Sequence, residues 1–135
     1  MNFKPIWPNG ARLALSLVIN VEEGAERSVA DGDPRAEAVD EMGLTVKPGI
    51  RNLSNESNYA YGINAGAPRI FDMLSQRGLK ATFASAAQSL EKAPEVARRI
   101  SDGKHETCAH GYRWLTQHNM DVKEERNFIK RASQS

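Results

Sequence analysis

Two adjacent carboxylates and a histidine are the residues of this chain whose types suit acid–base chemistry. Glu22 and Glu23 follow an apolar run that ends at Val21, and His110 closes a later segment that begins at His105. A carboxylate in a partly dry cleft can act as a general base on water, and an imidazole can exchange protons near neutral pH. We therefore predict that Glu22, Glu23 and His110 are catalytic, with solvated turn acids and a structural histidine as the alternatives.

The other potential nucleophile and ligands are less well placed for chemistry. On a regular strand His105 and His110 would lie ~17 Å apart, too far to bind one metal ion, and we interpret His105 as structural. Cys108 shares a face with His110 at a separation of ~6.6 Å. We interpret Cys108 as a small buried hydrophobic residue, with a catalytic thiol as the less favoured alternative. The sequence contains no Walker loop, dinucleotide fingerprint, serine elbow or paired Cys-x-x-Cys.

Three short segments predict the strands that must position these residues. They are residues 11–21, 79–85 and 105–110. The first is rich in leucine and β-branched residues and is bounded by turn formers, which is typical of a parallel strand covered on both faces. Glu22 follows the first strand and His110 ends the third, so both would lie at the carboxyl edge of a parallel sheet.

Helical patterns lie between and after these strands. We expect helices at residues 67–77 and 94–102, a weak helix at 36–42 within a polar excursion over 24–50, and a last helix from Asp121. Asp121 and Glu124 form a capping-box pattern. The helix that follows is expected to bury Val122, Phe128 and Ile129. The alternation of strands and helices predicts an α/β fold with a parallel sheet and crossover helices.

The composition is that of one soluble domain. The 135 residues are 40% hydrophobic and 26% charged, with a formal net charge of +1. Charges of both signs are scattered, so we expect neither a nucleic acid nor a membrane as partner. No apolar stretch approaches the ~20 residues that cross a bilayer, and the charged and proline residues near the start do not fit a secretory signal. We expect a cytoplasmic protein, and its single cysteine agrees with a reducing compartment.

Together these segments resemble a known family. The acids after the first strand, the run Ala81-Thr82-Phe83 and the segment 105–110 resemble successive strands of polysaccharide deacetylases, which share the NodB-homology fold, a distorted (β/α)7 barrel. The chain is most similar to the branch of metal-independent allantoinases and related cyclic-imide hydrolases. That branch is indicated by Val21-Glu22-Glu23-Gly24, by motif residues between Leu53 and Gly66, and by His110-Gly111-Tyr112-Arg113-Trp114. The resemblance implies that residues 1–135 form the N-terminal part of such a barrel.

The resemblance also implies roles for the motif residues. Glu22 or Glu23 would activate water for attack on a ring carbonyl, while His110 would exchange protons or stabilise the oxyanion. The flat ring of a cyclic amide such as allantoin would be held by the predicted substrate-binding residues Glu56, Tyr59, Tyr112, Arg113 and Trp114. An N-acetyl sugar is the alternative substrate. A non-catalytic remnant or a partner subunit is the alternative that is not an enzyme.

Two departures from the family pattern lead to further expectations. Trp114 occupies the position of the second histidine of metal-dependent deacetylases, which leaves too few ligands for a catalytic zinc, so we expect no metal and no other cofactor. A barrel normally needs about 200 residues or more, so we expect the chain to self-associate or to pair with a missing second half. As a truncated chain it is expected to be inactive or weakly active.

Overall fold

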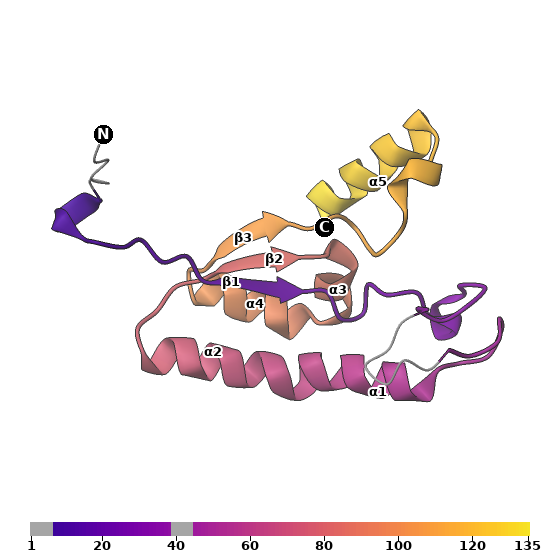
Figure 1. Ribbon diagram of the computed structural model, residues 1–135, viewed down its shortest axis with the longest axis horizontal. Helices are drawn as coiled ribbons and strands as arrows, with labels where there is room; N and C mark the ends of the chain where they lie inside the picture. Colours follow the sequence, from indigo (N-terminus) through magenta and orange to yellow (C-terminus); the bar gives the residue numbers. More distant parts are fainter. Residues whose placement is uncertain (1–6, 39–44) are drawn as a thin grey trace.

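A three-stranded parallel sheet is the centre of the computed structural model, which describes residues 7–38 and 45–135. The strands β1 (Val18–Val21), β2 (Thr82–Ser85) and β3 (Glu106–Ala109) lie in that order across the sheet. The last residues of the three strands are register partners, so their carboxyl ends meet at one edge (Figure 1). The predicted α/β fold with a parallel sheet is therefore confirmed.

Among the described residues, the α-helices that precede β3 in the chain form a layer on one side of the sheet (Figure 1). These helices are α1 (Leu53–Tyr61), α2 (Ala67–Gln76), α3 (Ala87–Lys92) and α4 (Pro94–Asp102), and α5 (Val122–Gln134) follows β3. A π-helical turn, Gly62–Gly66, joins α1 to α2, and single 3₁₀ turns lie at Pro8–Gly10, Val29–Asp31 and Gln117–Asn119. Helix α5 lies outside this layer, beyond β3, and contacts α3 (Figure 1). Over residues 7–38 and 45–135, no helix combines the length and apolar character that crossing a bilayer requires.

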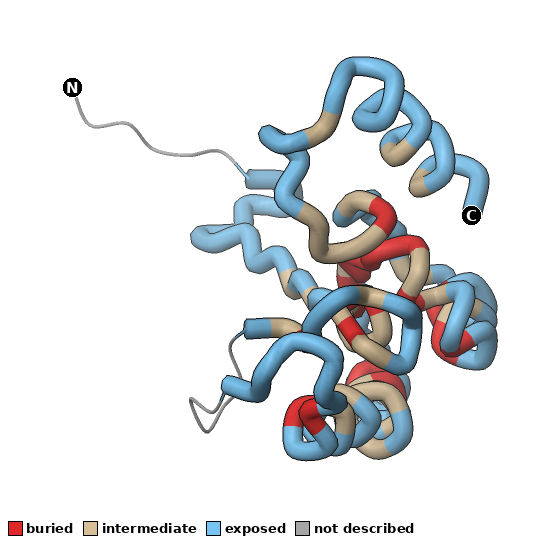
Figure 2. Tube along the Cα trace, turned by 90° about the vertical axis from the view of Figure 1, so that its right-hand side faces the viewer, coloured by how far each residue is buried: buried red, intermediate tan, exposed pale blue. Residues whose placement is uncertain are grey.

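The hydrophobic core lies between the sheet and helices α2 and α4. Phe71 of α2 stacks on Phe83 of β2 with ring centroids 5.0 Å apart, and the two residues are 3% and 2% exposed. The other members of this cluster are Val21, Leu74, Ala81, Ala93, Val96 and Ile100. Figure 2 shows a group of buried segments in the middle of the molecule, with further buried positions in α1 and in the loops. Because Val21 is the last residue of β1, the core fixes the backbone directly before Glu22.

The strands are shorter than the sequence predicts, most clearly at β1. Only Val18–Val21 pairs as strand within the predicted range 11–21, and Leu13 and Leu15 are 74% and 77% exposed. Val18 is 58% exposed, so the expectation of a strand covered on both faces is wrong for β1. The physical reason is that β1 is an outer strand, whose single neighbour among the described residues is β2, and residues 11–16 precede the segment where the two strands run side by side.

Helices α2 and α4 confirm the predicted helices at 67–77 and 94–102. The pattern did not predict α1, which is rich in Ser, Asn and Tyr and so has low helix propensity, or α3, which has only six residues. Asn52 starts α1 by accepting a hydrogen bond from the Asn55 N–H. The weak helix expected at 36–42 does not form over residues 36–38, and residues 39–42 lie outside the described residues.

Helix α5 has the predicted capping box but not the predicted buried face. Asp121 accepts a 2.8 Å hydrogen bond from the Glu124 N–H, and the Glu124 carboxylate accepts one of 3.0 Å from the Asp121 N–H. Val122 and Ile129 are 71% and 59% exposed, whereas Phe128 is partly buried. The expectation that Val122 and Ile129 are buried is therefore wrong. Within the described part of the chain, no strand follows β3 to cover this face of α5.

Candidate active site

Glu22 and His110, here called the site pair, meet at the carboxyl edge of the sheet. Because β2 lies between β1 and β3, the backbones of the two outer strands are about 10 Å apart. The side chains bridge this gap, with Glu22 Oε1 lying 3.2 Å from His110 Nε2. The Glu22 side chain is 21% exposed and that of His110 is 47% exposed. The contact thus fixes the two side chains relative to each other, and both remain accessible to solvent.

Backbone turns after β1 and β3 place both side chains at strand ends. The His110 N–H donates to the Ser85 carbonyl at 3.0 Å and so continues the pairing of β3 with β2. Gly111 follows with φ of +75°, a conformation that other residues rarely adopt, and the chain turns there. After Glu22, the Ala25 N–H donates back to the Glu22 carbonyl at 3.0 Å. Strand ends of this kind are where β/α folds place catalytic groups.

Glu23 has a different neighbour from Glu22. Its carboxylate accepts a 3.2 Å hydrogen bond from the Glu22 N–H and lies against Gly62, where a Cβ atom would overlap it. Gly62 thus permits close approach between the segment after β1 and the π-helical turn. Turns of this kind are frequent at functional sites. The sequence left the choice between the two acids open, and the structure assigns the contact with His110 to Glu22.

Tyr59 and Trp114 form an aromatic pair between α1 and the segment after β3. Their ring centroids are 6.0 Å apart and the rings are inclined at 86°, an edge-to-face arrangement. The backbone N–H of Trp114 donates to the Ala25 carbonyl at 2.9 Å, and this hydrogen bond joins the segment after β3 to the segment after β1. Both aromatic residues are partly exposed. The structure therefore brings together two of the five residues predicted to bind substrate.

Glu56 lies one turn before Tyr59 on α1, but its carboxylate is paired with Arg51. The Arg51 Nε donates to both carboxylate oxygens of Glu56, at 3.0 and 3.2 Å. The hydrogen bond from Arg51 holds the pKa of Glu56 below its usual value. The carboxylate is therefore ionised and engaged at neutral pH, and its contact with substrate stays a prediction.

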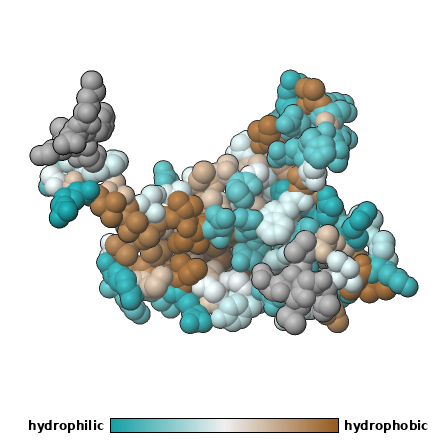
Figure 3. All heavy atoms as spheres, in the orientation of Figure 1, coloured by the Kyte–Doolittle hydropathy of each residue, from teal (hydrophilic) through white to brown (hydrophobic). Residues whose placement is uncertain are grey.

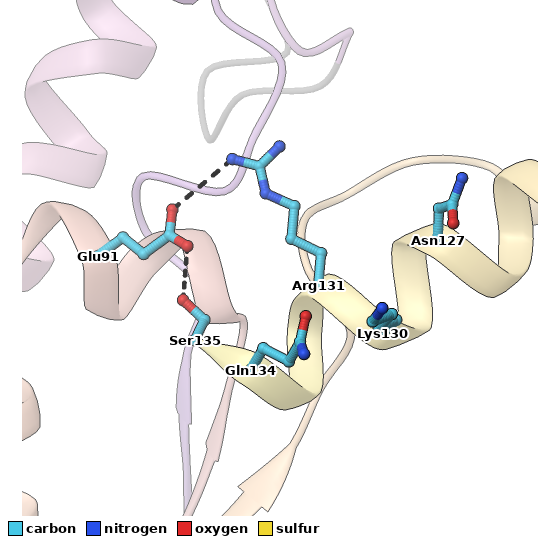
Figure 4. A pocket seen from close by; sticks show the side chains of 6 residues that line it. All are labelled: Glu91, Asn127, Lys130, Arg131, Gln134 and Ser135. Atoms are coloured by element: carbon cyan, nitrogen blue, oxygen red, sulfur yellow. Dashed lines mark hydrogen bonds and ion pairs between the residues drawn. The ribbon is translucent and has the colours of Figure 1, made fainter.

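Tyr112 packs toward α3 and α5. It is 5% exposed, and its hydroxyl donates to Glu91 Oε2 at 2.9 Å. The Arg131 guanidinium lies 3.9 Å from the ring centroid, and the Phe128 ring meets it edge-on at 6.0 Å. The Glu91 carboxylate also accepts a 2.5 Å hydrogen bond from the Ser135 hydroxyl, directly after α5, and lies 4.0 Å from Arg131 Nη2 of α5. Figure 4 shows both contacts. Tyr112 thus helps to hold α5 against α3, and these contacts give no support to its predicted role in substrate binding.

Arg113 forms an ion pair with Asp33 that is largely buried. Its Nη2 lies 2.6 Å from Asp33 Oδ2 and donates to the Glu26 carbonyl at 2.8 Å. Asp33 Oδ2 also accepts a 2.8 Å hydrogen bond from the Ser28 N–H. Burial alone would raise the pKa of Asp33, but the hydrogen bonds from Ser28 and Arg113 outweigh it and lower the pKa. Sequence reasoning missed Asp33, because nothing local distinguishes it from other loop acids.

The two remaining candidates are His105 and Cys108. As predicted, His105 is structural, since its Nδ1 accepts the Ala81 N–H at 3.3 Å and its ring packs 5.2 Å from that of Phe83. Burial, aided by the charge of Lys80, lowers the pKa of His105. Cys108 is exposed because β3 is an outer strand, so its interpretation as a buried residue is wrong.

The described residues do not provide a full set of ligands for a catalytic metal. The site pair offers one carboxylate and one imidazole, whereas catalytic zinc usually takes three protein ligands. In the described part of the chain, no three His, Cys, Asp or Glu side chains cluster as metal ligands. The carboxylate and the imidazole of the site pair are groups that can transfer protons.

Comparison with known proteins defines the family. The profile of the polysaccharide deacetylase family matches residues 56–135. A Schizosaccharomyces pombe protein described as "Putative polysaccharide deacetylase" is 32% identical over 132 residues, which cover 96% of this chain and 41% of that protein. The chain belongs to the polysaccharide deacetylase family, as its motifs predict.

Several solved structures are similar over 93% of the chain, and two of them share about 40% of its residues. These two are a "probable polysaccharide deacetylase" from Pseudomonas aeruginosa PAO1, with a TM-score of 0.86 and 41% identity, and Puue allantoinase, with a TM-score of 0.84 and 39% identity. The chain spans 43% and 42% of the lengths of these proteins. The sheet and helices described above are therefore part of a NodB (β/α) barrel fold, which confirms the predicted fold class.

Proposed function

We propose that this chain supplies the acid and the histidine of a hydrolase site that opens a cyclic amide such as allantoin. The observation that carries the proposal is the 3.2 Å contact between Glu22 and His110 at the carboxyl edge of the sheet. The similarity to Puue allantoinase supports a ring carbon–nitrogen bond as the target. The partly exposed pair of Tyr59 and Trp114 offers aromatic surface suited to a flat ring.

In this reaction Glu22 would act as the general base and His110 as the general acid. Glu22 takes a proton from water as the water oxygen bonds to the ring carbonyl carbon. The carbon–nitrogen bond breaks when the oxyanion collapses, and His110 passes a proton to the leaving nitrogen. The 3.2 Å separation lets the proton move between the two side chains. We propose that hydrolysis proceeds without a catalytic metal, because Glu22 and His110 contact each other and supply two of the three protein ligands that catalytic zinc usually takes.

A chimaera tests the substrate, with residues 1–135 replacing the matching segment of Puue allantoinase. We expect this chimaera to hydrolyse allantoin, to keep its activity after dialysis against a chelator, and to leave N-acetylglucosamine oligomers intact. Allantoate release and acetate release would be measured side by side. Acetate release that a chelator abolishes would replace the proposal with a metal-dependent deacetylase. A folded chimaera without either activity would favour a non-catalytic role.

We further propose that the 135-residue chain associates with a second copy of itself through its sheet edges. Within the described part of the chain, β1 and β3 each have one neighbouring strand. Figure 3 shows hydrophobic side chains gathered where the chain enters β1, and Leu13, Leu15 and Val18 are more than half exposed there. Because the strands are parallel and in register, β1 of each copy has the direction needed to pair with β3 of the other.

Light scattering over a concentration series should therefore show a mass that rises from monomer to dimer. Leu15→Lys should shift this equilibrium toward the monomer, because it places a charge in the exposed apolar segment that leads into β1. Met73→Lys is the matched control, since Met73 is 46% exposed on α2, away from the sheet edges. A monomeric mass at every concentration, with slow hydrogen exchange over residues 13–21, would contradict the proposal.

A further inference from the structure

The sheet alone does not bring the site pair together. Glu22 and His110 leave the two outer strands, and β2 keeps those strands about 10 Å apart. A 3.2 Å contact between the side chains therefore depends on the segments that follow the strands. We call residues 22–38 the β1 loop and residues 110–121 the β3 loop.

Among the described residues, two direct links besides the site pair itself join the β1 loop to the β3 loop. The first is the ion pair of Arg113 with Asp33, at 2.6 Å, with the Glu26 carbonyl as a second acceptor for the same Arg113 nitrogen, at 2.8 Å. The second is the 2.9 Å hydrogen bond from the backbone N–H of Trp114 to the backbone carbonyl of Ala25, a residue that is fully buried. Both links begin within four residues of His110, so they fix the β3 loop close to the site pair.

The ion pair of Arg113 with Asp33 opposes separation of the β1 loop from the β3 loop. The side chains of Arg113 and Asp33 are 14% and 15% exposed, so removing either partner leaves a charge in a largely dry place. The Ser28 N–H holds Asp33 from within the β1 loop. The Arg113 Nε is buried and has no hydrogen-bond partner among the described residues, so the guanidinium acts through Nη2. The ammonium group of a lysine at position 113 can donate to the same two acceptors, Asp33 Oδ2 and the Glu26 carbonyl.

We infer that Arg113 and Asp33 are positioning residues that hold Glu22 against His110 by clamping the β3 loop to the β1 loop. The inference deepens the proposed function, on which its consequence for catalysis rests. It assigns Arg113 a task different from direct contact with substrate. It also gives a function to Asp33, a residue outside the sequence motifs.

Histidine NMR signals of the 135-residue chain test the clamp without any substrate. The chain has three histidines, so the ring signals of His110 can be compared with those of His105 and His118 in one spectrum. Asp33→Asn and Arg113→Gln should each shift the His110 ring signals and leave those of His105 in place. The double variant should shift them no further than either single variant, because both substitutions break the same link. Arg113→Lys should restore much of the native His110 spectrum.

Asp72→Asn is the matched control for Asp33→Asn. Asp72 forms an ion pair with Arg99 at the same 2.6 Å separation, but this pair joins α2 to α4 and its side chains are 62% and 40% exposed. This variant should leave the His110 signals unchanged. If Asp33→Asn or Arg113→Gln unfolds the chain, the His105 ring signals lose their native positions. The comparison of His110 signals is then made with the variant that remains folded. Unchanged His110 signals in Asp33→Asn or Arg113→Gln would overturn the inference.

Kinetics in the Puue chimaera separate positioning from substrate contact. Misplacement of catalytic groups by about 1 Å can cost ~10²-fold in rate, so Arg113→Gln and Asp33→Asn should lower kcat by ~10- to 10²-fold with KM nearly unchanged. A raised KM with unchanged kcat would show that Arg113 contacts substrate and would overturn the inference. A chimaera inactive on allantoin would refute the proposed function alone, since the NMR comparison still decides whether the clamp exists.

Discussion

Glu22→Gln and His110→Ala should each lower kcat for allantoin by ~10²- to 10⁴-fold in the chimaera, the range that general acid–base groups typically contribute. Both side chains are partly exposed at strand ends, so neither substitution removes core packing. Turnover would be measured by allantoate release, and folding by far-ultraviolet circular dichroism. The double variant should be little worse than either single variant, because the two groups act as a unit.

Two neighbouring side chains serve as controls for this series. Glu23→Gln should have a smaller effect, because Glu23 lies against Gly62 rather than His110. Cys108→Ala should have almost none, because Cys108 is exposed on an outer strand. A series in which Cys108→Ala abolishes turnover and His110→Ala is tolerated would overturn the assignment of His110 as the catalytic histidine.

Phe83→Ala should lower the free energy of unfolding by ~3 to 5 kcal/mol, the usual cost of removing a buried aromatic ring. Phe83 is 2% exposed, stacks on Phe71 and contacts the ring of His105, so the substitution opens a cavity at the centre of the core. Urea titration at one fixed protein concentration would measure the change, because association alters apparent stability.

Met73→Ala is the control for this measurement. Met73 lies on the same helix as Phe71 but is 46% exposed, so its loss should change the free energy of unfolding by less than about 0.5 kcal/mol. Equal losses for the two variants would mean that the cluster around Phe83 is not the stabilising core.

The order of the three strands with helices α2, α4 and α5 could be predicted from the sequence, as could the meeting of an acid after β1 with His110 at one edge of the sheet. Helix α4 has the predicted bounds, α2 nearly so, and the capping box of α5 forms as predicted. These features depend on local patterns: hydrophobic periodicity, turn residues and caps involve residues only a few positions apart. The placement of Glu22 and His110 at one edge follows because parallel strands present their carboxyl ends together.

The partners of individual side chains were decided only by the tertiary structure. The sequence does not show that Glu22 rather than Glu23 contacts His110, that Arg113 pairs with Asp33, or that Cys108 is exposed. The exposed apolar face of α5 likewise depends on which strands stand beside it. The physical reason is that these contacts join segments distant in sequence. Whether a side chain is buried, paired or open is set by the neighbours that folding brings to it, which its own local sequence does not specify.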